Sequence, residues 1–461
     1  MGGELAAPAT GRVRGHNTGG GVHARRAYHR ASRARTGPDA RRSGGAGPGR
    51  AVAQPAPAEA VAAHPHLAGS VGAHPDPGRA NGLGGARRVD APQGPGHSYA
   101  LQADVDALRA IGTVGVLAEV DHGGALTRAR AGVTVLGGTE PLDWGSRFRI
   151  GSTTKTFVAA TILQLDAERV LSTEDTVERW LPGLVSGRGN NGGAITVRHL
   201  LQHTSGLFDY VSDEGFLATI STPEAFLANR FVTYTPQQLV RIAVAHPPRF
   251  APGARWDYSN TNYILAGLII EAATGEPWAA QVRKRIIRPL GLSGTTEPGT
   301  DPALPAPHPR GYQLFGTDGA YTDTTAHNMT WGGAAGSLVS TPRDVNTFLR
   351  ALMSGRLLPP AQLAAMRTTV PIGRDYQDIW PGGGYGLGIF RTDLPCGGVY
   401  WHHGGDVIGY SDTNGVTDDG ARSVTVASST NTFSDPDFAR ESVAGTNRLV
   451  RNALCAAPPG R

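Results

Sequence analysis

Segments with strand-like alternation lie at both ends of the region from residue 99 to residue 457, and the sequence between them is mostly helical. On the N-terminal side, residues 113–124 and 126–138 alternate apolar and polar side chains and are separated by glycines, which favours two antiparallel strands. After residue 384 strand-like segments return. This arrangement favours one antiparallel sheet built from both ends and flanked by helices, with a mostly helical insertion. The predicted fold class is therefore α/β, in the α+β sense.

The predicted sheet part covers about residues 99–190 and 384–457, and the predicted helical part covers about residues 191–383. We expect these parts to form one domain with a site in the cleft between them. Further strands are predicted at residues 148–152, 385–394, 399–405, 411–419 and 422–430. Helices are predicted at residues 103–112, 197–203, 236–246, 261–275, 341–355 and 437–454.

Residues 1–98 have a different composition, rich in Arg, Gly, Ala and Pro, with Tyr28 as their one aromatic residue. We expect them to form a disordered, low-complexity tail, because they offer little apolar surface to bury. Residues 1–100 hold 13 arginines against five acidic residues, whereas the rest of the chain has 30 basic and 33 acidic residues. The net charge of +5 therefore belongs to the tail. Without interleaved aromatic residues or a nucleic-acid-binding motif, we expect no nucleic-acid partner.

Neither a membrane segment nor a signal peptide can be read from the sequence. No stretch reaches 18 consecutive apolar residues, and the N-terminus lacks a charged segment followed by an apolar core. The chain has two cysteines, Cys396 and Cys455. Their wide spacing argues against a redox motif or a zinc site, and leaves two buried thiols or a structural bridge.

Ser152 and Lys155 lie three positions apart, just ahead of an apolar run. On a helix such residues share a face, so the lysine would lie beside the serine hydroxyl and, if desolvated, accept its proton. Alternatively, Ser152 caps the helix and Lys155 is solvated. The chain has only two lysines, Lys155 and Lys284, and uses arginine elsewhere. Because arginine does not deprotonate at usable pH, this usage counts against the second interpretation without excluding it.

Two further motifs contain groups suited to acyl transfer. Tyr258 and Asn260 form Y-x-N, in which a tyrosine can shuttle a proton and an asparagine can contact both a substrate carbonyl and the lysine. His403 and Gly405 form H-x-G on a predicted strand, where a glycine lets a substrate lie along the strand edge. Each motif also has an ordinary structural interpretation, as a turn or a glycine-rich hairpin. His203, in a similar local sequence, is interpreted as structural.

The order of these motifs, S-x-x-K, Y-x-N and then H-x-G, resembles the serine β-lactamase and penicillin-binding protein superfamily, in its class C β-lactamase and DD-peptidase branch. Similarity extends over residues 195–210, 258–271, 334–355 and 385–389, within about Tyr99 to Cys455. Within the superfamily, the chain is most similar to secreted actinobacterial D-alanyl-D-alanine carboxypeptidases.

The resemblance implies a β-lactamase/transpeptidase-like fold and a serine hydrolase that forms an acyl-enzyme. Ser152 would attack a carbonyl, Lys155 and Tyr258 would manage the protons, and either of them is the general base. Asn260 would orient the substrate, and His403 would complete the catalytic set. The backbone N–H groups of Ser152 and Asp406 would form the oxyanion hole.

The resemblance also implies the surroundings of this chemistry. It implies no cofactor and no metal, a small peptide or β-lactam as substrate, and a monomer. It further implies secretion and a disulfide between Cys396 and Cys455. Trp331 matches an aromatic residue of the substrate pocket in these carboxypeptidases; its alternative role is core packing.

The chain departs from the carboxypeptidase pattern where the free carboxylate of the substrate would bind. The family's arginine position falls on Phe390, with Arg391 next to it, and threonine positions beside Gly405 read Gly404 and Asp406. An ionised Asp406 would repel a substrate carboxylate by about 4 kcal/mol at 4 Å and an effective dielectric of 20. Alternatively, the register slips by one residue, Asp406 points away and Arg391 enters the site.

Two functions are considered: the first requires a site that accepts the substrate carboxylate, and the second fits a site with Asp406 in it. The first is a D-alanyl-D-alanine carboxypeptidase-type peptidase that is acylated by β-lactams. The second is a D-aminopeptidase, D-amino-acid amidase or esterase with the same catalytic groups. An efficient β-lactamase is less favoured, because rapid deacylation needs a positioned water and no motif in the sequence indicates residues that would hold it. A penicillin sensor that does not turn over is also less favoured, because no membrane segment is visible.

Overall fold

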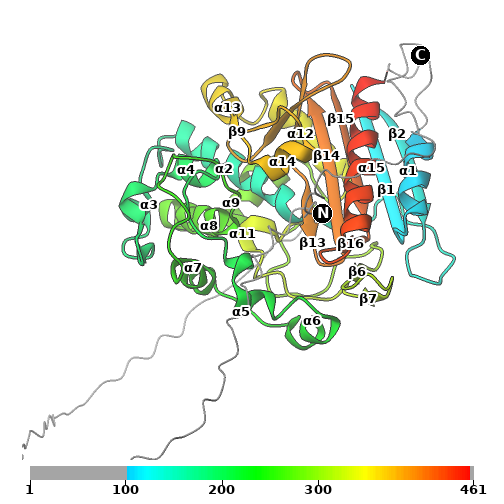
Figure 1. The fold of residues 1–461 in the computed structure, drawn as a ribbon. Helices are drawn as coiled ribbons and strands as arrows, with labels where there is room; N and C mark the ends of the chain where they lie inside the picture. The colour runs from blue at the N-terminus through cyan, green and yellow to red at the C-terminus, as the bar shows by residue number, and fades with distance from the viewer. Residues whose placement is uncertain (1–100, 457–461) are drawn as a thin grey trace, which may run out of the picture. The chain divides into compact units, whose positions relative to one another are not determined.

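A nine-stranded sheet forms one side of the computed structural model, which describes residues 101–456, and the helical part lies on the other side (Figure 1). Its strand order is β2-β1-β15-β14-β12-β11-β10-β9, with β13 paired to β14, and every pairing is antiparallel. The strands are β1 (Gly115–His122), β2 (Ala125–Gly132), β9 (Val370–Pro371), β10 (Gly384–Tyr385), β11 (Phe390–Asp393), β12 (Val399–His402), β13 (Gly405–Val407), β14 (Tyr410–Thr417) and β15 (Arg422–Ser428). The disorder predicted for residues 1–98 lies outside the described residues.

Pairing between β1 and β15 joins the two ends of the described chain. Val116 lies opposite Ser428, and the register continues to His122 opposite Arg422. This pairing confirms the prediction of one antiparallel sheet built from both ends. Strand β1 is buried along almost its whole length, because helices cover both faces of the sheet.

Helices α1 (Leu101–Ala110) and α15 (Pro436–Cys455) lie side by side on one face of the sheet (Figure 1). Both pack apolar side chains against it, including Leu108 and Leu449. Helix α12 (Pro342–Met353) covers the other face. There Asn346 donates to the Glu119 carbonyl of β1 at 2.8 Å and accepts from Thr425 of β15 at 2.9 Å.

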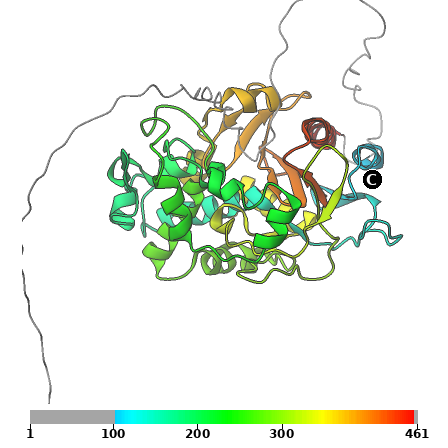
Figure 2. The same cartoon turned by 60° about the horizontal axis from the view of Figure 1, so that its bottom comes forward.

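The helical part packs around α2 (Thr154–Ala167) and α8 (Asn260–Thr274), and Figure 2 shows this part from another side. The side chains of both helices are buried on nearly all sides. Such helices are typical of a core rather than of a surface. The other α-helices are α3 (Val177–Trp180), α4 (Val197–Leu201), α5 (Glu214–Leu217), α6 (Pro223–Asn229), α7 (Pro236–Val244), α9 (Trp278–Val282), α10 (Arg288–Leu290), α11 (Gly333–Gly336), α13 (Pro360–Arg367) and α14 (Arg374–Ile379). The short turns are η1 (Gly151–Thr153), η2 (Gly192–Ala194), η3 (Tyr210–Ser212) and the π-helical η4 (Arg283–Ile287).

Short strands lie outside the main sheet. They are β3 (Phe148–Arg149) with β8 (Val339–Ser340), β4 (Ser186–Gly187) with β5 (Asn190–Asn191), and β6 (Tyr312–Leu314) between β7 (Tyr321–Asp323) and β16 (Thr430–Thr432). The strand predicted at residues 148–152 is thus shorter than expected and pairs with β8.

The single strand predicted at residues 385–394 is wrong, because a turn separates β10 from β11. Gly388 has φ +79° in this turn, and a Cβ there would lie 2.4 Å from that of Ala159. The Thr156 hydroxyl donates to the Gly388 carbonyl at 2.8 Å. The close approach of α2 therefore requires a turn here, and only glycine fits it.

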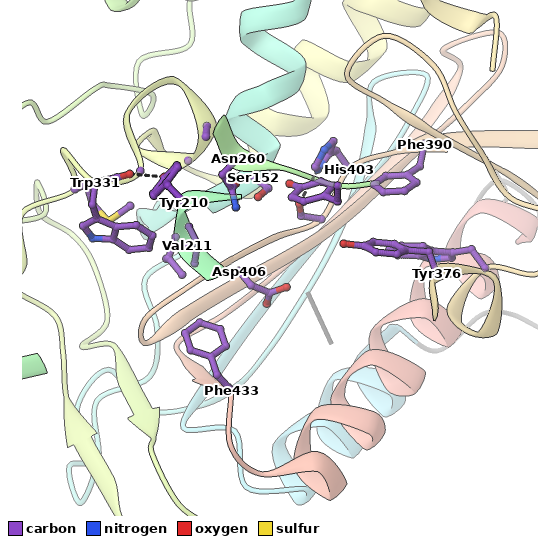
Figure 3. A pocket seen from close by; sticks show the side chains of 18 residues that line it. Ser152, Tyr210, Val211, Asn260, Trp331, Tyr376, Phe390, His403, Asp406 and Phe433 are labelled. Carbon is purple, nitrogen blue, oxygen red and sulfur yellow. Dashed lines mark hydrogen bonds between the residues drawn. The ribbon is translucent and has the colours of Figure 1, made fainter. Parts of the chain in front are cut away.

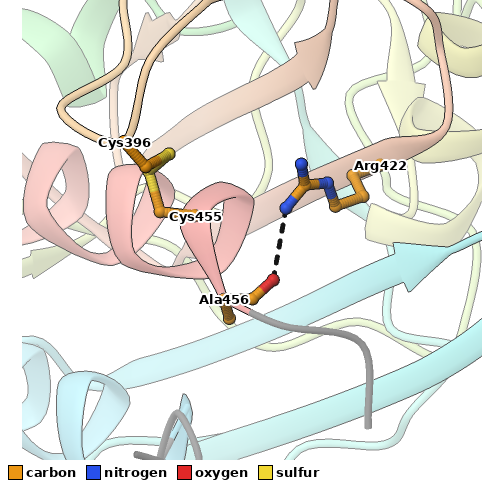
Figure 4. Close-up of a disulfide and its surroundings, with 4 residues drawn as sticks. All are labelled: Cys396, Arg422, Cys455 and Ala456. Atoms are coloured by element: carbon orange, nitrogen blue, oxygen red, sulfur yellow. Dashed lines mark hydrogen bonds between the residues drawn. A yellow bond between two sulfur atoms is a disulfide. The ribbon is translucent and has the colours of Figure 1, made fainter. Parts of the chain in front are cut away.

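A disulfide joins Cys396, in the loop between β11 and β12, to Cys455 at the end of α15 (Figure 4). The two residues are 59 positions apart, and their Cα atoms are separated by 5.7 Å. Nearby, Arg422 donates to the Ala456 carbonyl at 3.2 Å. The bridge therefore closes a loop that contains β12 to β16 and most of α15.

Replacing both Cys396 and Cys455 by serine is expected to lower the free energy of unfolding by about 4 kcal/mol, from the lost loop-closure constraint in the unfolded chain. Urea unfolding followed by circular dichroism measures this difference. The control is the parent protein in reducing agent, which should lose the same stability. An unchanged unfolding midpoint in both samples would contradict the stabilising role.

Candidate active site

Ser152 lies in the 3₁₀ turn η1, which leads directly into α2. The residues that precede η1 and α2, Ile150 and Thr153, make no side-chain cap hydrogen bond. Instead, the Ser152 Oγ accepts a hydrogen bond from Lys155 Nζ at 2.9 Å. The structure therefore brings the two residues together as the S-x-x-K interpretation predicts, and Ser152 is not a helix cap.

Lys155 is fully buried in α2. Its ammonium donates to Ser152, to the Asn260 Oδ1 at 2.8 Å and to the Ala335 carbonyl of α11 at 2.7 Å. Loss of hydration lowers the pKa of Lys155 to about 7, although the negative charge of Asp209 opposes this shift. Near neutral pH a large share of Lys155 is thus unprotonated and able to accept a proton.

Tyr258 precedes α8, and Asn260 is the first residue of that helix. The Tyr258 ring lies 4.9 Å from Lys155 Nζ. Burial raises the pKa of Tyr258 well above its usual value, although Ser152 is near enough to the Tyr258 hydroxyl to oppose this shift. The phenol is therefore neutral near pH 7, which suits it to relay a proton rather than to start the reaction as a tyrosinate.

The H-x-G motif lies beside the nucleophile turn, in the link between β12 and β13. A Cβ on Gly405 would lie 1.9 Å from the Ile150 carbonyl, so the glycine allows β13 to approach η1. A Cβ on Gly151 would lie 2.8 Å from the Asp406 amide nitrogen. The amides of Ser152 and Asp406 are thus close neighbours. Gly405 itself does not line the pocket, whereas Gly404 does.

His403 is buried, and both of its ring nitrogens have partners. Nε2 lies 3.1 Å from the Tyr385 hydroxyl, and Nδ1 lies 2.7 Å from the Gly404 carbonyl. Burial, together with the charge of Lys155, lowers the pKa of His403 to about 3. A neutral imidazole with this arrangement donates from Nδ1 and accepts at Nε2, so it holds the link between the strands in place.

A network behind the nucleophile turn also fixes this link. The Thr153 hydroxyl donates to the His403 carbonyl at 2.8 Å and lies 3.1 Å from both carboxyl oxygens of Asp412. Asn414 donates to Thr153 at 3.0 Å and accepts from the His403 amide. These side chains tie η1 to β12 and β14.

Ser152 opens into a pocket that encloses about 760 Å³ of empty space, including solvent at its mouth (Figure 3). Ser152, Asn260 and His403 lie together at one side. Most of the wall is apolar or aromatic, and its ring-bearing residues besides Tyr258 and His403 are Tyr210, Trp331, Tyr376, Trp380, Phe390 and Phe433. The pocket therefore suits a substrate with a large apolar part.

Asp406 points its carboxylate into this pocket (Figure 3). Surrounding protein removes part of its hydration and raises the pKa of Asp406 to about 7, although the group remains open to solvent from the pocket. Asn431 lies within 3.3 Å of its Oδ1. Above about pH 7, the pocket that contains Ser152 thus also contains the negative charge of Asp406.

Phe390 lines the pocket, whereas Arg391 does not. In the register of β11 with β12, Phe390 lies opposite His402 and Arg391 opposite Trp401, so their side chains leave opposite faces of the sheet. Arg391 pairs with Asp393 at 2.8 Å. Arg391 therefore does not enter the pocket, and this position disfavours the alternative in which it binds the substrate.

The family model described as Beta-lactamase matches residues 101–447. The chain belongs to the beta-lactamase family. Among solved structures, the D-stereospecific amidohydrolase from Streptomyces sp. is 42% identical, with a TM-score of 0.68, over 74% of this chain and 97% of that one. The D-amino acid amidase from Ochrobactrum anthropi SV3, complexed with D-phenylalanine, is 28% identical, with a TM-score of 0.65, over 77% and 96% of the two chains.

Curated relatives of the family match over shorter regions. Penicillin-binding protein 4* from Bacillus subtilis (strain 168) is 35% identical over 155 residues, which cover 34% of this chain and 31% of that protein. The matched regions cover between 31% and 56% of the length of the first three such relatives. Because these matches are partial, the activity of this beta-lactamase family member has to be inferred from the residues of its own site.

Several residues of the site lie outside the S-x-x-K, Y-x-N and H-x-G motifs and were not predicted as site residues. Asp209 accepts from the Asn260 Nδ2 at 3.0 Å, and it lies in the segment 195–210 that contributed to the family resemblance. Tyr385 holds His403 from β10. Tyr376 and Trp380 come from the region of α14, for which no element was predicted.

His203 does not line the pocket but packs against residues that precede α8. Its Nδ1 accepts from the Ser259 amide at 3.2 Å, and its ring lies 4.2 Å from that of Tyr258, centroid to centroid. This packing agrees with the structural interpretation of His203.

Proposed function

We propose that this beta-lactamase family hydrolase cleaves amides or esters of D-amino acids that have a free α-ammonium group. The observation that supports this choice is the Asp406 carboxylate in the pocket, together with the position of Arg391 outside it. A carboxylate attracts an ammonium group and repels the terminal carboxylate of a D-alanyl-D-alanine peptide. The names of the two solved relatives, an amidohydrolase and an amidase, agree with this assignment.

In the proposed reaction, neutral Lys155 takes the proton of Ser152 while Oγ bonds to the substrate carbonyl carbon. The oxyanion accepts hydrogen bonds from the Ser152 and Asp406 amides. The tetrahedral intermediate then expels the amine or alcohol, which receives a proton from Lys155 through the Tyr258 hydroxyl. Water attacks the acyl-enzyme by the reverse proton path and releases the D-amino acid.

The aromatic residues that line the pocket favour a substrate with an apolar or aromatic side chain. Trp331, Tyr376 and Phe390 offer ring faces in the pocket, and burying such a side chain contributes about 1.5–3 kcal/mol. Penicillins have a carboxylate that would meet Asp406, so we expect slow acylation by them. The proposed substrate is a small molecule, and the proposed working form is a monomer without metal or cofactor.

We also propose an extracellular location. The disulfide between Cys396 and Cys455 is typical of an oxidising compartment. Within residues 101–456, no helix is long and apolar enough to cross a membrane.

A panel of matched substrates tests the proposed function. At about pH 7.5, where the Asp406 carboxylate and the substrate α-ammonium are both largely charged, we expect D-phenylalanine amide to be hydrolysed with a kcat/KM at least about tenfold higher than that of N-acetyl-D-phenylalanine amide, since one charged contact contributes about 1.5–3 kcal/mol. L-phenylalanine amide and Ser152→Ala are the controls, and ammonia release is the measurement. Faster release of D-alanine from a D-alanyl-D-alanine peptide than of ammonia from the free amide would favour the carboxypeptidase instead.

A further inference from the structure

Asn260 lies between Lys155 and a buried carboxylate that the proposed reaction does not use. We propose that Asp209 is a positioning residue, whose carboxylate fixes the side-chain amide of Asn260 so that its oxygen faces Lys155. This inference rests on the proposed function, because it assigns to Asp209 a role in preparing Lys155 to activate Ser152.

The donors and acceptors around Asn260 allow only one orientation of its amide. Asn260 Nδ2 donates to the Asp209 Oδ2 at 3.0 Å, and its Oδ1 accepts from Lys155 Nζ at 2.8 Å. An ionised carboxylate only accepts hydrogen bonds, and an ammonium only donates them. A flipped amide would place two acceptors together at Asp209 and two donors together at Lys155, so Asp209 excludes that state.

Asp209 is itself held in place. It is 2% exposed, and its Oδ1 accepts from the Val211 amide at 3.2 Å, at the start of η3. The preceding residue is tied to α8, because Thr261 donates to the Phe208 carbonyl at 2.7 Å. The carboxylate therefore has a fixed position relative to Asn260. Capping of η3 alone would explain the contact with Val211 but not the contact with Asn260.

Asp209 is also the acidic group that acts on Lys155. The other titratable side chains around the lysine are Tyr258, whose ring is 4.9 Å from Nζ, Tyr263, at 5.6 Å, and His403. Burial raises the pKa of both tyrosines and lowers that of His403, so all three are neutral near pH 7. Their neutrality leaves Asp209 as the charge that opposes the effect of burial on the pKa of Lys155.

The substitution Asp209→Asn separates positioning from capping. Its side-chain oxygen can still cap η3 at Val211, but its NH₂ group then faces Asn260 and forces the amide to flip. The flipped amide presents N–H donors to Lys155, and the negative charge is lost. Both changes disfavour the ammonium, so we expect the pKa of Lys155 to fall by about one pH unit. At about pH 8, where Lys155 is mostly neutral in both proteins, the flipped N–H group would occupy the lysine lone pair that accepts the Ser152 proton, so we expect kcat/KM to fall about 10- to 100-fold, part of what a positioned base contributes.

The chain's two lysines make the pKa of Lys155 directly measurable. Protein labelled with ¹³C at the lysine Cε position gives signals from Lys155 and from Lys284, which is 64% exposed in its side chain and serves as the reference. Titration of the Lys155 signal in the parent, in Asp209→Asn and in Asp435→Asn is the test. Asp435 caps α15 in the same way, with no role in the site, so its variant is the matched control.

We expect a lower pKa of Lys155, and a matching shift of the acidic limb of kcat/KM to lower pH, only in Asp209→Asn. If that variant does not fold, Asp209→Ser retains a capping hydroxyl and should show a smaller fall in the pKa of Lys155, because the negative charge is lost but the amide of Asn260 is not forced to flip. An unchanged Lys155 titration in the folded variant overturns the inference and leaves the proposed function intact. Equal hydrolysis by the parent and by Ser152→Ala overturns the proposed function, whatever the titration shows.

Discussion

Replacing Lys155 with arginine is expected to slow acylation of Ser152 by about 10²- to 10⁴-fold, which is the contribution of a positioned general base. The pKa of Lys155 is about 7 because the side chain is buried in α2, whereas arginine remains protonated at usable pH. The substitution thus keeps a positive charge near Ser152 and removes the proton acceptor. The burst of nitrophenol from a D-phenylalanine nitrophenyl ester measures the acylation rate.

Lys284→Arg is the matched control for this experiment, because it makes the same change at the other lysine. Lys284 lies at the surface, 3.8 Å from Glu276, and should tolerate arginine without loss of rate. In the parent, the acylation rate should rise as pH passes upward through about 7, since only neutral Lys155 accepts a proton. A near-normal burst in Lys155→Arg would rule out the lysine as the base and leave Tyr258 for that role.

Asp406→Asn is expected to lower kcat/KM for D-phenylalanine amide by about 10- to 100-fold, the value of a hydrogen bond to a charged group. The substitution removes the negative charge but keeps the Asp406 backbone amide and almost the same side-chain volume. N-acetyl-D-phenylalanine amide, which has no ammonium group, should be hydrolysed as before. Because the pKa of Asp406 is about 7 and an α-ammonium group loses its proton at about pH 8, the parent's preference for the free amine should be largest between these two values and fall on either side.

Arg391→Ala is the control for the register of β11. Its guanidinium pairs with Asp393 outside the pocket, so this variant should retain the parent's preference. A loss of activity in Arg391→Ala equal to that in Asp406→Asn would contradict the assignment of the two faces. Improved release of D-alanine by Asp406→Asn would in turn agree with repulsion of the substrate carboxylate in the parent.

The main features of the fold can be predicted from the sequence because they depend on local patterns. Alternation in β1, β2, β14 and β15 identifies strands at both ends of the region, and the apolar run after Ser152 and the pattern of residues 261–275 indicate the helices α2 and α8. The break at Gly388 could not be predicted in this way. It results from the close approach of Ala159, a residue more than two hundred positions away.

The S-x-x-K, Y-x-N and H-x-G motifs can be read directly from the chain, and their order indicates the family. Tertiary structure decided which side chain of Phe390 and Arg391 enters the pocket, because a shift of one residue reverses the faces of a strand. Tertiary structure also placed Asp209 beside Asn260, where its charge acts on Lys155. Such contacts depend on how distant segments pack, and local sequence does not specify that packing.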